Sequence, residues 1–153
     1  MKIPAGLFRI GKEVLRHLLR RPVVGIAAAA RTPDGRWLLV RRSDTGGWAL
    51  PGGTLEWGES FRVALERELK EETGAPLQSL GRLVGVYSAP HRDPRFHAVT
   101  IVVEASVGVP AAAENPAEIV EVRAFSDAEL PSELSHGMSD MLEDARTGRT
   151  TWE

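Results

Sequence analysis

The sequence predicts an α/β fold, with helices packed around one mixed β-sheet. Its 153 residues are 42% hydrophobic, which suffices for one domain with one core. After residue 22, short apolar runs rich in Val, Ile and Ala indicate strands, and segments with helical spacing of apolar residues alternate with them. No repeat or long linker divides the chain. We therefore expect a helix over residues 1–21 and one domain over residues 22–153.

The first 21 residues predict an amphipathic helix. Its apolar side chains lie at helical spacing with basic residues between them: Leu7, Ile10, Val14, Leu15, Leu18 and Leu19. These charges distinguish the segment from the apolar core of a signal peptide, and no run approaches the roughly 20 apolar residues of a membrane span. We expect the helix to serve packing or dimerisation. We also expect a cytoplasmic protein, with export as the alternative.

The strands are predicted from apolar runs bounded by turn residues. Residues 23–30 and 36–42 flank the sequence Arg-Thr-Pro-Asp-Gly and predict a β-hairpin. Three later runs predict further strands: residues 83–89, 98–107 and 119–125. A last helix is predicted to begin near Pro131 and Ser132 and to end near Gly148.

Residues 52–75 predict a helix that follows a glycine turn and ends at a glycine. Its buried face is defined by apolar side chains at helical spacing, namely Phe61, Ala64 and Leu65. Glu68 and Glu72 fall on this apolar face, and Glu71 falls at its margin. A solvated acidic helix end, the alternative, would place these glutamates on the polar face.

Three like charges at this spacing repel one another, and the negative end of the helix dipole adds to the cost. A cation between the side chains would remove both unfavourable interactions. Carboxylate oxygens are the ligands that hard divalent ions prefer, so the pattern predicts a Mg²⁺ or Mn²⁺ site. The chain has no cysteine, which excludes disulfides, a thiolate nucleophile and cysteine-bound zinc.

The same stretch resembles a family motif. Gly53 is followed after five residues by Glu59 and after seven more by residues 67–75, Arg-Glu-Leu-Lys-Glu-Glu-Thr-Gly-Ala. This spacing is similar to the Nudix box, G x5 E x7 R E U x E E x G U, where U is a bulky aliphatic residue; Ala75 is smaller than that pattern asks. The preceding residues 46–53 also resemble the family. The resemblance implies a Nudix-like α/β/α sandwich.

The resemblance also implies roles for the residues of the box. Four positions are expected to hold Mg²⁺ or Mn²⁺: Gly52 through its carbonyl, Glu68, Glu71 and Glu72. Glu71 is alternatively expected to position the attacking water. Glu59 and Arg67 are expected to form an ion pair that supports the catalytic loop. The family often takes its catalytic base from a later loop, where Glu118 is the favoured candidate and Glu114 and Glu121 are the alternatives.

The resemblance implies hydrolysis of a nucleoside diphosphate linked to another group. Pro90 lies where the ADP-ribose pyrophosphatase group typically carries proline, whereas Phe96 stands where many of its members have glycine. Tyr87 or Phe96 is a candidate to stack on the base of the substrate. The alternative to a substrate-binding segment is a polar surface loop with a turn at Asp93 and Pro94. The candidate substrate contacts are Arg41, Arg42, Trp48, Gly53, Pro90, Arg92, Arg95 and Phe96. Strand alternation predicts that only one of the two adjacent arginines faces the phosphates.

Three functions remain open at this point. The first is Mg-dependent cleavage of ADP-ribose or a nucleotide sugar into a nucleoside monophosphate and a sugar phosphate, by a homodimer. The second is a MutT-like nucleoside triphosphate pyrophosphatase. The third is a nucleotide sensor without catalysis. The net charge of −2, from 19 basic and 21 acidic residues, offers no strong field for nucleic acid or an anionic membrane, so we expect neither as a partner.

Overall fold

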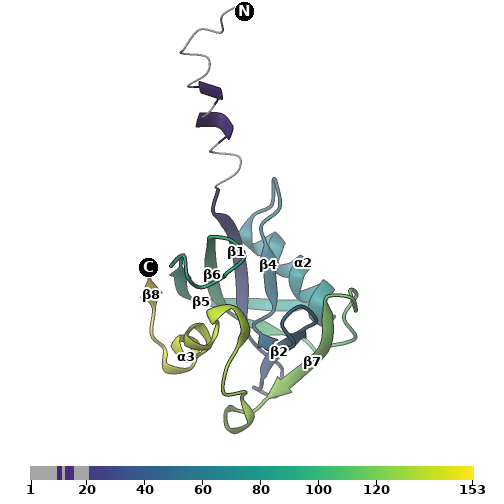
Figure 1. Ribbon diagram of the computed structural model, residues 1–153. Coiled ribbons are helices and arrows are strands. Elements are labelled where there is room, and N and C mark those ends of the chain that lie inside the picture. The colour runs from purple at the N-terminus through teal and green to yellow at the C-terminus, as the bar shows by residue number, and fades with distance from the viewer. Residues whose placement is uncertain (1–9, 12, 16–20) are drawn as a thin grey trace, which may run out of the picture.

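A single mixed sheet forms the centre of the fold (Figure 1). The computed structural model describes residues 10–11, 13–15 and 21–153. The strands in this part of the chain are β1 Val23–Arg31, β2 Trp37–Arg42, β3 Trp48–Ala49, β4 Gly52–Thr54, β5 Leu77–Tyr87, β6 Ala98–Val107, β7 Ile119–Phe125 and β8 Thr151–Trp152. The helices and 3-10 turns with assigned bounds are α2 Phe61–Thr73, η1 Asp127–Glu129, η2 Ser135–Gly137 and α3 Ser139–Thr147.

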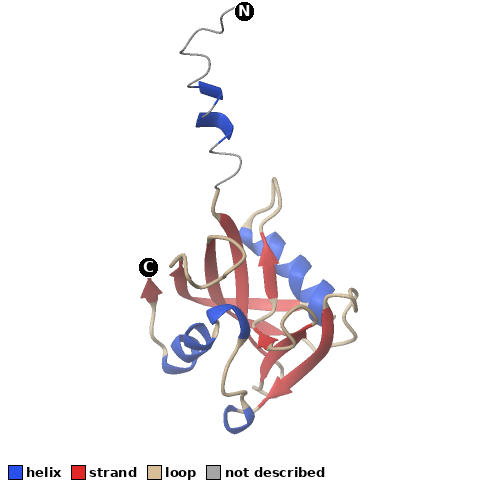
Figure 2. Cartoon of the chain, in the orientation of Figure 1, coloured by secondary structure: helices blue, strands red, loops and turns tan. Residues whose placement is uncertain are grey.

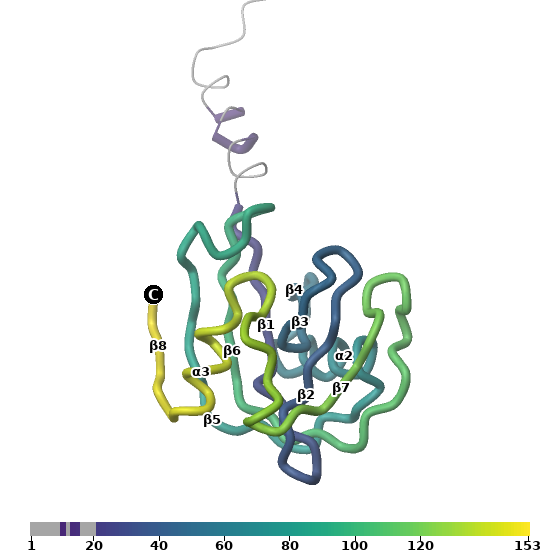
Figure 3. Tube along the Cα trace, turned by 60° about the horizontal axis from the view of Figure 1, so that its bottom comes forward, coloured from purple at the N-terminus to yellow at the C-terminus, as the bar shows by residue number. Residues whose placement is uncertain are grey.

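The sheet contains both parallel and antiparallel pairs. β1 pairs antiparallel with β2 and β4 and parallel with β6, where Ile26 lies opposite Ile101. β5 pairs antiparallel with β6 and parallel with β8, while β7 pairs antiparallel with β2 (Figure 3). The prediction of an α/β fold with a mixed sheet is therefore confirmed.

The two faces of the sheet carry separate hydrophobic clusters because side chains alternate along a strand. On β1, Ile26 and Ala28 join a cluster with Leu65 and Leu69 of α2. Ala27, the residue between them, joins the opposite cluster, which includes Met141, Leu142 and Ala145 of α3. The helices thus cover opposite faces, which gives the expected α/β/α sandwich (Figure 2). The small alanines Ala28 and Ala30 of β1 let α2 lie close to the sheet.

The predicted hairpin and its turn are present. The N–H of Gly35 donates to the Thr32 carbonyl over 2.8 Å, which closes the turn between β1 and β2. The third predicted strand begins earlier than residue 83. β5 starts at Leu77, because that residue already pairs with Val107 of β6.

Helix α2 matches the prediction at its end but not fully along its face. Gly74 ends the helix with a left-handed φ of 63°, and its N–H donates to the Lys70 carbonyl. Phe61, predicted to be buried, is 40% exposed. It lies in the first turn of α2, whereas the buried residues of the helix begin at Ala64. The apolar stripe therefore extends beyond the part of the helix that packs on the sheet.

The last helix is shorter than predicted. α3 begins at Ser139 rather than near Pro131, and it ends at Gly148 as expected. His136 and Gly137 have φ values of 57° and 63°, and an α-helix cannot continue through left-handed residues. The segment before α3 therefore forms the 3-10 turn η2.

Part of the N-terminal helix lies within the described residues. Residues 10–11 and 13–15 are helical and exposed. Residue 21, the last of the helix expected over residues 1–21, is described and lies outside any helix, and the remaining residues of that prediction lie outside the described part of the chain. Among the described helices, none combines the length and apolar character needed to cross a membrane.

Candidate active site

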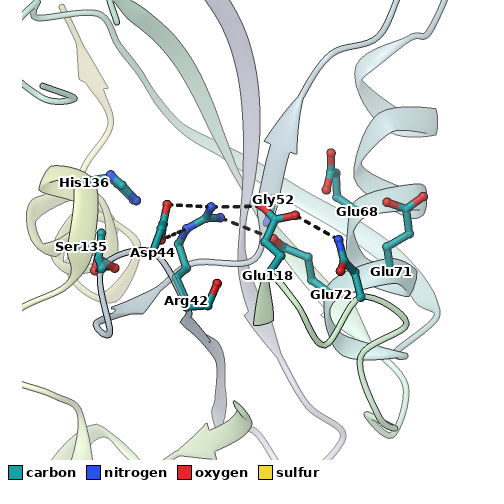
Figure 4. A network of polar contacts seen from close by, with 12 residues as sticks. Arg42, Asp44, Gly52, Glu68, Glu71, Glu72, Glu118, Ser135 and His136 are labelled. Carbon is teal, nitrogen blue, oxygen red and sulfur yellow. Dashed lines mark hydrogen bonds and ion pairs between the residues drawn. The ribbon is translucent and has the colours of Figure 1, made fainter. Parts of the chain in front are cut away.

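A cavity of about 350 Å³ lies where β1, β2 and β4 meet the C-terminal half of α2. Its walls include Arg42 and the glycines of β4, together with four carboxylates: Glu68, Glu71, Asp93 and Glu118. Figure 4 shows the three glutamates around Arg42 and Gly52. The structure thus brings the glutamates of α2 and the later acidic loop to one place.

Glu72 is the most buried of the acidic residues of α2, with 5% of its surface exposed. The N–H of Gly52 donates to its Oε2 over 2.8 Å, and Nη1 of Arg42 lies 3.8 Å from its Oε1. Burial raises the pKa of Glu72 to about 8, against the lowering effect of the Gly52 hydrogen bond. A carboxylate at this position therefore needs more positive charge than the protein supplies.

Glu68 and Glu71 lie at different depths. The Glu68 side chain is 12% exposed and accepts a 2.9 Å hydrogen bond from Nη1 of Arg67. Burial raises the pKa of Glu68 despite this contact. The Glu71 side chain is 44% exposed and lies 3.5 Å from the same nitrogen. The helical wheel therefore placed Glu68 and Glu72 correctly on the buried face, with Glu71 at its margin.

The ion pair expected between Glu59 and Arg67 is present. Nε and Nη2 of Arg67 donate to the two oxygens of Glu59 over 2.9 and 3.0 Å. Nη2 also donates to the Thr54 carbonyl over 3.2 Å. These contacts hold the segment between β4 and α2 against the helix. The hydrogen bonds from Arg67 lower the pKa of Glu59 and keep it ionised.

Both glycines of β4 are required by close approaches. Gly52 has a φ of 151°, and a Cβ there would overlap the Ile26 carbonyl. A Cβ on Gly53 would overlap the carboxylate of Glu68. The backbone therefore lies directly against this carboxylate, which a larger residue would prevent. The expected ligand role of the Gly52 carbonyl stays a prediction.

The oxygen donors at this site are of the kind that bind a hard divalent cation. Glu68, Glu71 and Glu72 offer carboxylate oxygens beside a backbone turn, and Gly53 leaves space in front of Glu68. Across the described residues, no three acidic or histidine side chains converge closely enough to hold a metal as they stand. Glu68 is turned to Arg67 and Glu72 to Gly52. Binding a cation therefore requires side-chain rotation at one or more of these glutamates.

Of the two adjacent arginines, the structure selects Arg42. Its Nε donates to Asp44 Oδ1 and its Nη2 to Glu118 Oε1, both over 3.0 Å. Arg41 points to the other side, where its Nη2 lies 2.9 Å from Oε2 of Glu121. Arg41 is absent from the walls of the cavity. The interpretation of Arg41 as a substrate contact finds no support here, because strand alternation turns it away.

The three candidates for the catalytic base are separated in the same way. Glu118 lines the cavity. Glu114 lies 3.9 Å from Nζ of Lys70, and Glu121 pairs with Arg41, both outside the cavity walls. The geometry therefore favours Glu118, whose role as a base remains a prediction.

Arg92 was a candidate substrate contact, but the structure shows it bound to other groups of the protein. It donates five hydrogen bonds: to Glu153, to Asp140 and to the Gly137 carbonyl. Its guanidinium also lies 4.9 Å from the Tyr87 ring centroid. Because a guanidinium has five N–H donors, Arg92 has none left for a phosphate. It connects the loop after β5 to α3 and to the end of the chain.

The remaining candidate substrate contacts differ in whether they line the cavity. Phe96 is 39% exposed and lines the cavity, as does Arg95, which pairs with Asp93 and Asp44. Pro90 lines neither this cavity nor the larger one beside it. Tyr87 also lines the smaller cavity, but it is 1% exposed and its hydroxyl donates to Asp144. Trp48 lies outside the cavity walls, where it is partly buried and contacts Phe125 edge to face.

His136 is the site residue that the sequence did not single out clearly. It lines both cavities, and its φ of 57° is the only positive value at a non-glycine among the described residues. Its Nδ1 lies 3.5 Å from Nη2 of Arg95, while its buried Nε2 has no hydrogen-bond partner in the described part of the chain. Burial, and then the charge of Arg95, lowers the pKa of His136. The sequence signal was the adjacent Gly137, which marks a turn.

Comparison with known proteins gives the same picture. The sequence model of a family described as NUDIX domain matches residues 19–145. The chain is also similar to the crystal structure of a MutT NUDIX hydrolase from Burkholderia pseudomallei. The identity is 32%, the TM-score is 0.70, and the match covers 82% of this chain and 98% of that one.

Curated relatives match over shorter stretches. An ADP-ribose pyrophosphatase of Methanocaldococcus jannaschii is 47% identical over 72 residues, which cover 45% of this chain and 42% of the relative. A CTP pyrophosphohydrolase of Escherichia coli is 40% identical over 74 residues, which cover 46% and 51%. The chain thus spans about half or less of the length of these relatives.

Proposed function

Because the chain belongs to the Nudix family, we propose that it hydrolyses the diphosphate bond of a nucleoside diphosphate linked to a second group, with Mg²⁺ or Mn²⁺ as cofactor. The preferred substrate is ADP-ribose or a nucleotide sugar. Water adds across the P–O–P bridge, so the bridging bond breaks and two monophosphate esters form. These products are a nucleoside monophosphate and a sugar phosphate.

One observation carries this proposal. Glu72 is almost completely buried, on the face of α2 that packs against the sheet, together with Glu68. Each pKa unit corresponds to about 1.4 kcal/mol, so keeping Glu72 ionised against a pKa of about 8 is costly without a further cation. A purely structural helix would place an apolar residue there. We attribute the retained carboxylates to cation binding.

The residues at the cavity then have distinct tasks; Glu72 lies next to its wall, which Gly52, Glu68, Glu71, Arg42 and Glu118 line. Glu68, Glu71 and Glu72 would hold the cation, with the Gly52 carbonyl as a further oxygen ligand. A bound divalent ion neutralises the diphosphate and lowers the pKa of the attacking water. Glu118, which lines the cavity, would accept the proton that this water loses. Arg42, 16% exposed at its side chain, would contribute positive charge beside the phosphates by exchanging one of its present carboxylate partners, Asp44 or Glu118, for a phosphate oxygen.

Two alternatives are distinguished by their products. A MutT-like nucleoside triphosphate pyrophosphatase would release pyrophosphate. The similarity to a CTP pyrophosphohydrolase makes this activity the second candidate. A sensor would bind nucleotides without turnover, but every acidic position of the box is filled. The proposal also includes a homodimer, supported by the exposed apolar side chains Ile10, Val14 and Leu15. Light scattering after gel filtration tests the homodimer.

Product analysis tests the activity. The protein is incubated with Mg²⁺ and, separately, with ADP-ribose, nucleotide sugars, dinucleoside polyphosphates and nucleoside triphosphates. Nucleoside monophosphate with sugar phosphate is the expected result, and Glu72→Gln should abolish most of it. Pyrophosphate from triphosphates would favour the MutT-like alternative. Binding without turnover would favour the sensor.

A further inference from the structure

A second, larger cavity adjoins the candidate active site. Its volume is about 860 Å³, within the range of small-molecule sites. Arg92, Arg95 and His136 belong to the walls of both cavities. Figure 4 shows Asp44, Ser135 and His136 on one side of Arg42, with the glutamates of α2 on the other. A ligand bound at those glutamates therefore has a second hollow within reach.

The positive charges in this larger cavity are already neutralised. Arg92 uses all five of its donors on Glu153, Asp140 and a carbonyl. Arg95 pairs with Asp93 over 2.8 Å and with Asp44 over 3.0 Å. Each arginine thus faces two carboxylates. A terminal phosphate placed here would meet more negative charge than positive charge.

Hydroxyl groups and a free carboxylate complete the wall. The Oγ atoms of Thr45 and Ser135 lie 2.9 Å apart and share one hydrogen bond, so the pair retains a further donor and acceptor capacity. Glu133 also lines the cavity, and within the described residues no hydrogen bond or ion pair engages its carboxylate. These groups accept hydrogen bonds from hydroxyls. Phe, Tyr and Trp are absent from the described wall, whose only aromatic rings are the smaller imidazoles of His91 and His136.

We infer that the larger cavity is the subsite for the terminal sugar of the substrate, with Ser135 and Glu133 as specificity-determining contacts to its hydroxyls. The inference rests on the proposed function and adds to it the place where the terminal sugar binds and the residues that recognise its hydroxyls. The base lies in the other direction, toward Phe96, whose exposed ring lines only the smaller cavity.

A pair of ligands with the same base and the same diphosphate charge isolates the terminal group. ADP-ribose is compared with the pentyl ester of ADP, whose alkyl chain carries no hydroxyl. The test variants are Ser135→Ala and Glu133→Gln, alone and combined. Both residues are at least partly exposed, so the fold should tolerate the changes. The matched controls are Ser132→Ala and Glu66→Gln, which lie outside both cavities.

Two readouts keep the two proposals separate. The first is kcat/KM with Mg²⁺, and the second is the Kd of each ligand in metal-free buffer. We expect each test variant to lose about two- to tenfold in kcat/KM and in affinity for ADP-ribose, as for one lost hydrogen bond, and less than about twofold for the pentyl ester. Equal losses on both ligands, or no loss on ADP-ribose, would overturn the sugar subsite. If the variants lose affinity for ADP-ribose and keep it for the pentyl ester, but no protein turns over either ligand, the proposed activity alone is overturned.

Discussion

The backbone N–H of Gly52 donates to Oε2 of Glu72 over 2.8 Å, which joins the turn of β4 to the last turns of α2. This contact orients a carboxylate that is 5% exposed, and it leaves Oε1 directed to Arg42 at 3.8 Å. The glycine turn and the helix are therefore one unit, because the conformation of the turn fixes the orientation of the carboxylate.

Replacing Gly53 should impair the cation site more than the fold. In Gly53→Ala the new Cβ would overlap the carboxylate of Glu68 and force it to move. We expect kcat/KM to fall at least about tenfold and the Mg²⁺ concentration for half-maximal activity to rise. Ser79→Ala, an exposed position on β5 outside both cavities, is the control. A Gly53→Ala enzyme with normal Mg²⁺ dependence would contradict the assignment of Glu68.

The stability of the protein should depend on pH through Glu72. Its pKa is about 8 in the folded protein against an ordinary value of 4.5, so the folded state keeps a proton that the unfolded chain releases between these values. The free energy of unfolding contributed by this group is therefore greatest below pH 4.5 and is lost as the pH rises to about 8. Glu72→Gln has no such proton to lose.

Urea unfolding of both proteins in EDTA measures this effect. We expect Glu72→Gln to exceed the wild type by more than about 1 kcal/mol at pH 8.5, and the two to differ less at pH 5. The comparison of the two proteins cancels the other titrating groups. A difference that does not change between the two pH values would show that Glu72 is ionised in the folded protein throughout.

Glu118 and Glu121 provide a matched pair for the catalytic base. Glu118 lines the cavity, whereas Glu121 pairs with Arg41 outside it. Glu118→Gln should lower kcat about 100-fold, as for the loss of a general base, with a smaller change in KM. Glu121→Gln should stay within about twofold of the wild type. Steady-state kinetics decides, and the opposite ranking would place the base elsewhere.

The loop after β5 should depend on Glu153. Its carboxylate accepts hydrogen bonds from Arg92 and from the backbone N–H groups of Ser88 and Ala89. Glu153→Gln should loosen this loop, which carries Arg95 and Phe96, and raise KM about two- to tenfold with less change in kcat. Glu143→Gln, an exposed partner of Arg146, is the control. An unchanged KM would show that the loop holds its position without Glu153.

The sequence was sufficient to predict those elements whose position follows from a single helical or strand periodicity. The helical spacing of residues 61–73 placed Glu68 and Glu72 on the buried face, and β6 and β7 have the predicted bounds. Local turn chemistry was equally informative at Gly35 and Gly74, which close a hairpin and end a helix.

Long-range pairing was not predictable in the same way. Alternation showed that Arg41 and Arg42 diverge, but only the pairing of β2 with β7 shows which one faces the cavity. The saturation of Arg92 depends on Asp140 and Glu153, which are 48 and 61 residues away along the chain. The start of α3 depends on the left-handed conformation of His136. This conformation could not be predicted from the residue type, because histidine rarely adopts it.

The most direct test of the central claim is a titration of the wild type and of Glu72→Gln with Mn²⁺. Electron paramagnetic resonance measures the concentration of the free ion at each step. The claim is that the glutamates of α2 form a divalent-cation centre. We expect saturable binding to the wild type and at least about tenfold weaker binding to Glu72→Gln, with Glu66→Gln on the polar face unchanged. Equal Mn²⁺ affinity in the wild type and Glu72→Gln would contradict the account.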